Sequence, residues 1–195
     1  PPPISDNSFL MEEAYNQERG VVQHISLFTY HRDAGTWAYN FTQEWPFRGQ
    51  RHQLSYTVAV VRQVGPAGPN TGLGDLVLNY RLQLVGGEGA RIWIAPRLSA
   101  ILPTGRWQSG RGNGGFGVQF ALPVSITLVP KLVTHFNAGV SLVQNARNGQ
   151  NNRADLVAFT GGASAIFLAT PAINLMFETI VSSEAEVTGS GTTAR

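Results

Sequence analysis

The amino-acid sequence predicts an all-β protein, an antiparallel up-and-down β-barrel that crosses a membrane. Apolar and polar residues alternate along one segment after another from residue 21 onward, and the side chains of a strand point alternately to its two faces. Charged residues make up only 13% of the 195-residue chain, whereas 22 residues are glycine. The alternating segments are roughly 9–12 residues long, close to the roughly 9–11 that a tilted strand needs to span a bilayer.

Nine segments carry this alternation. In DLVLNYRLQL, residues 75–84, Leu76 and Leu78 fall on one face of a strand, and Asn79 and Arg81 fall on the other. A transmembrane barrel places the apolar face against lipid and the polar face toward a watery lumen. The nine predicted strands comprise residues 21–31, 37–45, 53–61, 75–84, 91–100, 116–127, 132–142, 155–168 and 173–181.

Seven of these strands have an assignable apolar face, and the first and eighth do not. Gly161 and Gly162 predict a bulge in the eighth strand. In chain order, the apolar faces comprise Trp37, Tyr39, Phe41 and Trp45; Leu54, Tyr56, Val58 and Val60; Leu76, Leu78, Tyr80, Leu82 and Leu84; Ile92, Ile94, Pro96 and Leu98; Val118, Phe120, Leu122, Val124 and Ile126; Leu132, Phe136, Ala138, Val140 and Leu142; and Ile173, Leu175, Phe177 and Val181.

Residues 1–20 are predicted to be a separate N-terminal periplasmic segment. A short helix capped by Asn7 or Ser8 is one prediction, because Glu12 and Glu13 would lie near its start, where the helix dipole favours carboxylates. An extended segment is the alternative. In either form, the segment would plug the lumen or rest on the periplasmic mouth.

The connections between the predicted strands alternate in length. Outer-membrane barrels have short periplasmic turns and longer external loops, so the alternation predicts a periplasmic N-terminus. Such single-chain barrels also have even strand numbers, so a count of nine predicts that the barrel domain, residues 21–195, is incomplete; the alternative is that the count is off by one strand. The short connections lie near residues 48–50, 86–89, 129–131 and 169–171, and the long ones at 65–74, 103–115 and 144–154.

Four stretches resemble a known family: NSFLMEEAYNQERGVVQHI, the FTQEWPFRGQRHQLSYT hairpin, GLGDLVLNYRLQL and APRLSAILPTG, together spanning about residues 6–105. The chain resembles the outer-membrane proteins named for the MetA pathway of phenol degradation. The resemblance implies a barrel of roughly twelve strands, even in number like other single-chain barrels, that moves hydrophobic or aromatic compounds. It also implies that about three C-terminal strands lie beyond residue 195, which agrees with the parity of the strand count.

Charged and amide side chains on the polar faces form the candidate site. Rings of inward-facing charge set selectivity in pores, so a zone lined by Arg81 and Arg97 would favour anionic solutes such as aromatic carboxylates. The alternative is that these arginines pair with Glu44, Asp75 and Glu178 and only fill the interior. The predicted lumen or solute-binding residues are Arg81, Arg97, Asn79, His135, Asn137, Glu178 and Glu44.

Other classes of function find little support in the sequence. The chain has no cysteine for disulfides, thiolate metal sites or thiol catalysis, and its net charge of +2 is too small to indicate nucleic-acid binding. GRGNGG, residues 110–115, has glycine-motif spacing but precedes a strand rather than a helix, so it predicts a loop and no nucleotide site. We therefore expect no enzyme, no metal and no cofactor.

The predicted function is a porin-like passive channel or transporter for small hydrophobic or aromatic molecules in the bacterial outer membrane. Its partners would be the lipid bilayer and a small-molecule solute. Two alternatives stay open: a soluble β-barrel that binds a small ligand in an apolar interior, and an outer-membrane protein that is structural and does not conduct.

Overall fold

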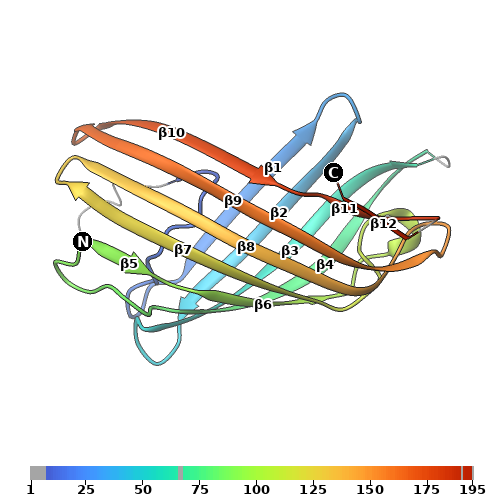
Figure 1. The fold of residues 1–195 in the computed structure, drawn as a ribbon, viewed down its shortest axis with the longest axis horizontal. Coiled ribbons are helices and arrows are strands. Elements are labelled where there is room, and N and C mark those ends of the chain that lie inside the picture. Colours follow the sequence, from blue (N-terminus) through green and yellow to red (C-terminus); the bar gives the residue numbers. More distant parts are fainter. Residues whose placement is uncertain (1–7, 66–67, 190, 195) are drawn as a thin grey trace.

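The computed structural model describes residues 8–65, 68–189 and 191–194. Its main feature is one antiparallel sheet that curls into a half-barrel, with β7 to β10 forming the near wall in Figure 1 and β1 to β4 the far wall. The order of strands is β1-β2-β3-β4-β6-β7-β8-β9-β10, with β5 paired to β7. The strands of this sheet are β1 (Gln23–His31), β2 (Thr36–Pro46), β3 (His52–Gly65), β4 (Gly68–Leu82), β5 (Ile92–Ile94), β6 (Arg97–Leu102), β7 (Gly117–Val129), β8 (Leu132–Arg147), β9 (Arg153–Thr170) and β10 (Ile173–Ser182).

All nine predicted strands are present, so the prediction of an all-β antiparallel fold is confirmed. Several strands are longer than predicted: β8 has 16 residues and β9 has 18. The predicted alternation of short and long connections is wrong, because β3 continues to Gly65 and β4 already begins at Gly68. Backbone pairing needs no apolar side chains, so the Gly- and Pro-rich stretch 65–74, predicted as a loop, mostly extends this hairpin.

The fifth predicted strand is divided into β5 and β6 at Ala95 and Pro96. Proline has no backbone N–H and cannot donate to the ladder. The carbonyl oxygen of Pro96 still accepts a hydrogen bond from Leu82 N at 3.0 Å. The interruption therefore changes the pairing locally but leaves the strand in its predicted place.

The C-terminal residues contain a hairpin that the sequence did not predict. It consists of β11 (Ala185–Thr188) and β12 (Gly191–Ala194), and a 3-10 turn (Trp107–Ser109) lies in the long β6–β7 connection. Asn148 Nδ2 donates to Val187 O at 3.0 Å, which ties the hairpin to the β8–β9 turn. The last strand predicted from the sequence ended at residue 181.

The predicted N-terminal helix is wrong in the described part of the segment, because residues 8–22 form no helix. Its alternative, an extended segment, is what the structure contains, whereas Asn7 lies outside the described residues. No helix within the described ranges is long and apolar enough to cross a membrane.

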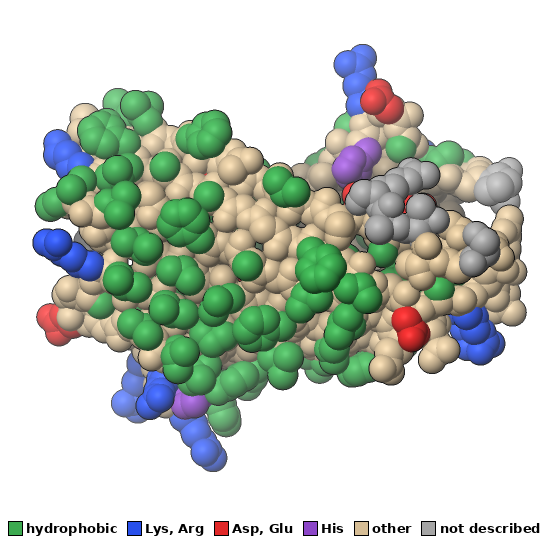
Figure 2. Space-filling model, viewed as in Figure 1, with side chains coloured by type: hydrophobic (Ala, Val, Ile, Leu, Met, Phe, Trp, Pro, Cys, Tyr) green, Lys and Arg blue, Asp and Glu red, His purple; other side chains and the backbone are tan. Residues whose placement is uncertain are grey.

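The half-barrel has a polar concave face and an apolar convex face. On the concave side, Gln53 is 2% exposed and His135 is fully buried, whereas on the convex side Phe177 is 70% exposed and Leu98 is 58% exposed. Figure 2 shows apolar side chains spread across one outer face and charged side chains near its margins. Among the described residues, β1 pairs only with β2 and β10 only with β9, so the curl is open between these two edges.

The predicted bulge at Gly161 and Gly162 is also wrong. Both glycines pair in regular register, opposite Val181 and Ile180 of β10. A Cβ atom built on Gly162 would overlap the Met11 side chain. It would also overlap the backbone oxygen of Thr179 in β10, so the glycine permits close packing at this position and not a distortion of the strand.

Candidate functional site

Residues 8–17 cross the concave face, and we call them the inner segment. Their trace lies between the near and far walls in Figure 1. Amides at positions 12, 14 and 16 meet the wall, which is the period of two of an extended chain. In order along the segment, Phe9 N and Leu10 N donate to the Glu178 carboxylate at 3.1–3.3 Å, Glu12 N to Asn137 Oδ1 at 2.7 Å, Ala14 N to Ser125 Oγ at 2.9 Å, Asn16 N to Gln83 Oε1 at 3.0 Å and Gln17 N to Gln53 Oε1 at 2.7 Å.

Two wall amides bind the inner segment as a neighbouring strand would. Asn137 accepts from Glu12 N and donates through Nδ2 to Glu12 O, both at 2.7 Å. Gln83 accepts from Asn16 N and donates through Nε2 to Ala14 O at 2.8 Å. Buried peptide groups need partners, and here side chains supply them. This explains why the segment is extended, since a helix would bind these peptide groups internally.

A carboxylate from the inner segment lies between the two predicted arginines. Glu12 Oε1 is 3.1 Å from Arg81 Nη1, and Glu12 Oε2 is 3.0 Å from Arg97 Nε. Arg97 Nε also donates to Glu12 Oε1 at 3.1 Å. Glu12 thus bridges β4 and β6 through charge-assisted hydrogen bonds, which are among the stronger hydrogen bonds in proteins.

The two arginines differ in their other partners. Arg81 is 5% exposed, and it donates through Nε to Asn16 Oδ1 at 2.8 Å and through Nη1 to Glu13 O at 3.1 Å. Arg97 Nη1 instead donates to wall groups, Asn79 Oδ1 at 2.9 Å and Ser99 Oγ at 2.6 Å. Arg81 therefore holds the inner segment, whereas Arg97 is anchored to the wall.

The structure brings all seven predicted site residues to the concave side, but the ion pairs of Arg81 and Arg97 in the described part of the chain are with Glu12. Of the three predicted acidic partners, Glu44 lies near enough to both arginines to interact with them electrostatically. Glu44 Oε2 accepts from Gln53 Nε2 at 2.9 Å, and Glu178 binds the start of the inner segment. Asp75 accepts from Gly105 N and Asn113 N at 2.9 and 2.8 Å. The carboxylate in direct contact with both arginines is that of Glu12, from a segment outside the sheet.

His135 is a predicted site residue with no solvent-exposed surface. It is fully buried, and its Nδ1 lies 2.7 Å from Ser125 Oγ. Its ring centroid lies 6.0 Å from that of Tyr15 in the inner segment. His135 therefore positions Ser125, whose Oγ accepts a hydrogen bond from Ala14 N of the inner segment.

Two cavities of about 190 Å³ each flank the Glu12–Arg97 pair, and both residues line both cavities. The first lies toward β7–β10 and includes apolar side chains. The second lies toward β1–β4 and includes the Glu44 carboxyl group. The first is lined by Leu10, Met11, Glu12, Arg97, Gln119, Ala121, Asn137, Ala138, Thr160, Gly161 and Ile180.

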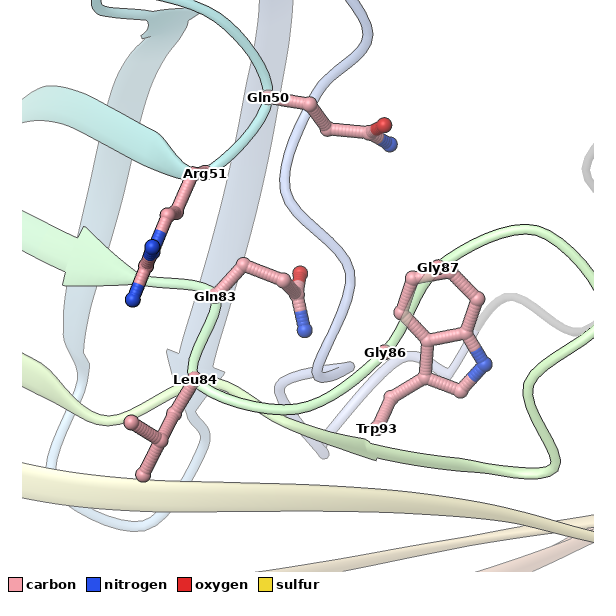
Figure 3. A pocket seen from close by; sticks show the side chains of 7 residues that line it. All are labelled: Gln50, Arg51, Gln83, Leu84, Gly86, Gly87 and Trp93. Atoms are coloured by element: carbon pink, nitrogen blue, oxygen red, sulfur yellow. The ribbon is translucent and has the colours of Figure 1, made fainter.

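A third cavity, of about 380 Å³, lies at the end of β4. Figure 3 shows the Gln83 side chain pointing toward the inner segment and the Trp93 ring next to Gly86 and Gly87. A Cβ atom at Gly86 would overlap this ring. The centroid of the Trp93 ring lies 5.2 Å from that of Tyr15, edge to face, so the inner segment also packs against an aromatic anchor.

The described part of the chain holds no group of three or more His, Asp or Glu side chains that could bind a metal ion. No protein-family model and no curated protein matches the chain. The resemblance to the outer-membrane family named for phenol degradation therefore stays a prediction.

Sequence reasoning missed Glu12, Asn16, Gln53, Gln83 and Ser125 as site residues. The last three share the inward parity of Asn79 and Arg81, so the period-two pattern could have found them. Glu12 and Asn16 had no such signal. Their roles depend on a segment folding back across the sheet.

Proposed function

We propose that this protein is a bacterial outer-membrane β-barrel that provides a passive route for small hydrophobic or aromatic molecules. The proposal involves no cofactor and no covalent step. The lipid bilayer and a small-molecule solute are the partners, and the solute would pass along the concave face.

The observation that carries the proposal is the inverted distribution of side chains. Phe159 and Leu175 are 60% and 62% exposed on the convex side, while Ser99 and Ser164 are 2% and 3% exposed on the concave side. Among the described buried residues, polar side chains outnumber apolar ones. Monomeric soluble proteins rarely expose large contiguous apolar patches, whereas outer-membrane barrels have this distribution.

The same distribution argues against a soluble barrel with a ligand in an apolar interior. Such a barrel would place Leu98 and Phe120 inside and Gln53 and Arg81 in water. The cavities on the concave side are instead bordered by arginine, glutamate and amide groups.

The inner segment favours the second candidate, a structural barrel that does not conduct. It occupies the concave face from β10 to β3 through hydrogen bonds with the walls. A conducting barrel therefore requires the solute to pass beside the segment or the segment to move. The two cavities beside Glu12 support the first route.

The half-barrel has two unpaired edges, β1 and β10, in its described part. Lipid offers no partner for exposed backbone N–H and C=O groups. We include in the proposal that additional strands close the barrel, to about twelve in all, an even number as in other single-chain barrels.

Planar-bilayer conductance of the full-length protein tests the proposal. We expect discrete current steps with a preference for anions, and we expect Arg97→Ala to reduce this preference. Steps with unchanged selectivity would retain the channel and remove Arg97 from its constriction. Silence from well-inserted protein would favour the structural barrel, and a monodisperse protein that needs no detergent would overturn the membrane proposal.

A further inference from the structure

The Glu12 carboxylate occupies a position that a free carboxylate could take. It lies within 3.1 Å of guanidinium nitrogens of both Arg81 and Arg97. Guanidinium groups match carboxylates in geometry and charge, and such pairs recur wherever proteins recognise carboxylate ligands. We infer that Arg81 and Arg97 form a binding site for small apolar monocarboxylates, and that Glu12 is a tethered competitor which fills this site when no ligand is present. This inference rests on the proposed passage along the concave face.

The exposure of the three side chains indicates where exchange begins. The Arg81 side chain is 6% exposed, whereas those of Arg97 and Glu12 are 20% and 26% exposed. An incoming carboxylate therefore reaches Arg97 first. Arg81 stays bound to Asn16 and to the carbonyl of Glu13, so it holds the inner segment during the exchange.

Only the Glu12 side chain has to move. Its peptide group is held separately by Asn137, through two hydrogen bonds of 2.7 Å. Asn79 and Ser99 hold Nη1 of Arg97 in place from the wall. The site is thus pre-organised on rigid strands, and rotation of one side chain exposes it.

The cavity on the β7–β10 side fits the rest of such a ligand. Leu10, Met11 and Ile180 give it an apolar part, and Arg97 lies at its border. Apart from Glu12, none of its described lining residues is acidic, whereas Glu44 adds a second carboxyl group to the lining of the other cavity. A volume of about 190 Å³ is below the roughly 300 Å³ at which sites for drug-sized ligands begin. A benzoate-sized monocarboxylate is the class that matches.

Equilibrium binding of benzoate to the full-length protein in detergent micelles tests the inference. Benzamide, which has the same shape and no charge, is the comparison ligand. Removing the competitor raises the binding-competent fraction, so we expect Glu12→Gln to bind benzoate at least about tenfold more tightly than the wild type. Benzamide should bind weakly to both.

The variant Glu88→Gln is the matched control, because it removes the same charge from an exposed turn residue, and its benzoate affinity should equal that of the wild type. Adding Arg97→Gln to Glu12→Gln should abolish the gain. Glu12→Asp keeps the charge on a shorter side chain and should give an intermediate affinity. This variant replaces Glu12→Gln in the test if Glu12→Gln does not fold.

Equal benzoate affinity in the wild type and in both Glu12 variants would overturn the inference. So would benzamide binding as tight as that of benzoate. Binding in micelles does not require conduction, so the two proposals can fail separately. If the protein shows no conductance but binds benzoate in this way, only the channel is overturned. If it conducts but Glu12→Gln leaves its benzoate affinity unchanged, only the carboxylate site is overturned.

Discussion

Gln83 illustrates how much of this architecture depends on single amide side chains. Its Oε1 and Nε2 bind Asn16 N and Ala14 O, and the residue is 8% exposed. Two peptide groups of the inner segment therefore depend on one side chain. A buried polar group left without its partner costs more than an average hydrogen bond contributes, so the wall amides at these positions control whether the segment is held.

At this scale we predict that Gln83→Ala loosens the inner segment. The change removes both hydrogen bonds and leaves buried peptide groups without them, which should lower the free energy of unfolding by about 1–3 kcal/mol. Urea unfolding in detergent measures the loss, and hydrogen exchange at Asn16 N should accelerate. Gln150→Ala, at an exposed turn, should change stability by less than about 0.5 kcal/mol. Equal effects of the two variants would contradict the assigned role of Gln83.

At the scale of elements, the inner segment is the part that local sequence describes least well. Its acidic residues suggested the first turn of a helix, yet Glu12 binds arginines of β4 and β6. The alternating amides of the extended form find partners on β7 and β8 and just beyond β4. Tertiary hydrogen bonds therefore override a weak local helix preference.

The position of the inner segment predicts a disulfide in a double variant. Ser8 Oγ and Ser164 Oγ are 3.0 Å apart, and the chain has no native cysteine to interfere. Ser8→Cys combined with Ser164→Cys should oxidise readily, because the two side chains already meet. The bridge would link residues 156 positions apart and stabilise the fold by up to about 5 kcal/mol.

A gel shift without reductant and intact mass measure this oxidation. The control pair Ser8→Cys with Ser26→Cys joins the segment to an exposed position on β1 and should stay reduced. Equal oxidation of both pairs would mean that the inner segment leaves the concave face.

At the scale of the whole molecule, the decisive property is which face of the curl is apolar. The outward residues of neighbouring strands are in register, as in Leu98 opposite Phe120 and Phe120 opposite Val140. They form a continuous apolar surface over the near wall (Figure 2). Lipid and water make opposite demands on such a surface, so one charged substitution can distinguish the two environments.

We predict that Leu98→Arg impairs folding into lipid bilayers. An arginine on the lipid-facing side of a barrel costs about 2–4 kcal/mol near the bilayer centre. Folding yield into liposomes, followed by heat-dependent gel mobility, measures the effect. Gln150→Arg in an exposed turn is the matched control and should fold normally. Undiminished folding of Leu98→Arg, together with better solubility without detergent, would support the soluble alternative instead.

The sequence by itself determined the positions of the nine strands and, for seven of them, the inward and outward faces; the faces of the first and eighth needed the structure. The sequence could do so because alternation with a period of two is a local property, carried by neighbours such as Leu78 and Asn79. Strand ends were less predictable, because pairing continues into Gly- and Asn-rich stretches wherever a partner strand is present. Only the tertiary structure decided the path of residues 8–17 and the partner of Arg81 and Arg97. Glu12 lies 69 and 85 positions from these arginines in the chain, and no local pattern encodes a contact that exists only once the sheet has curled around the segment.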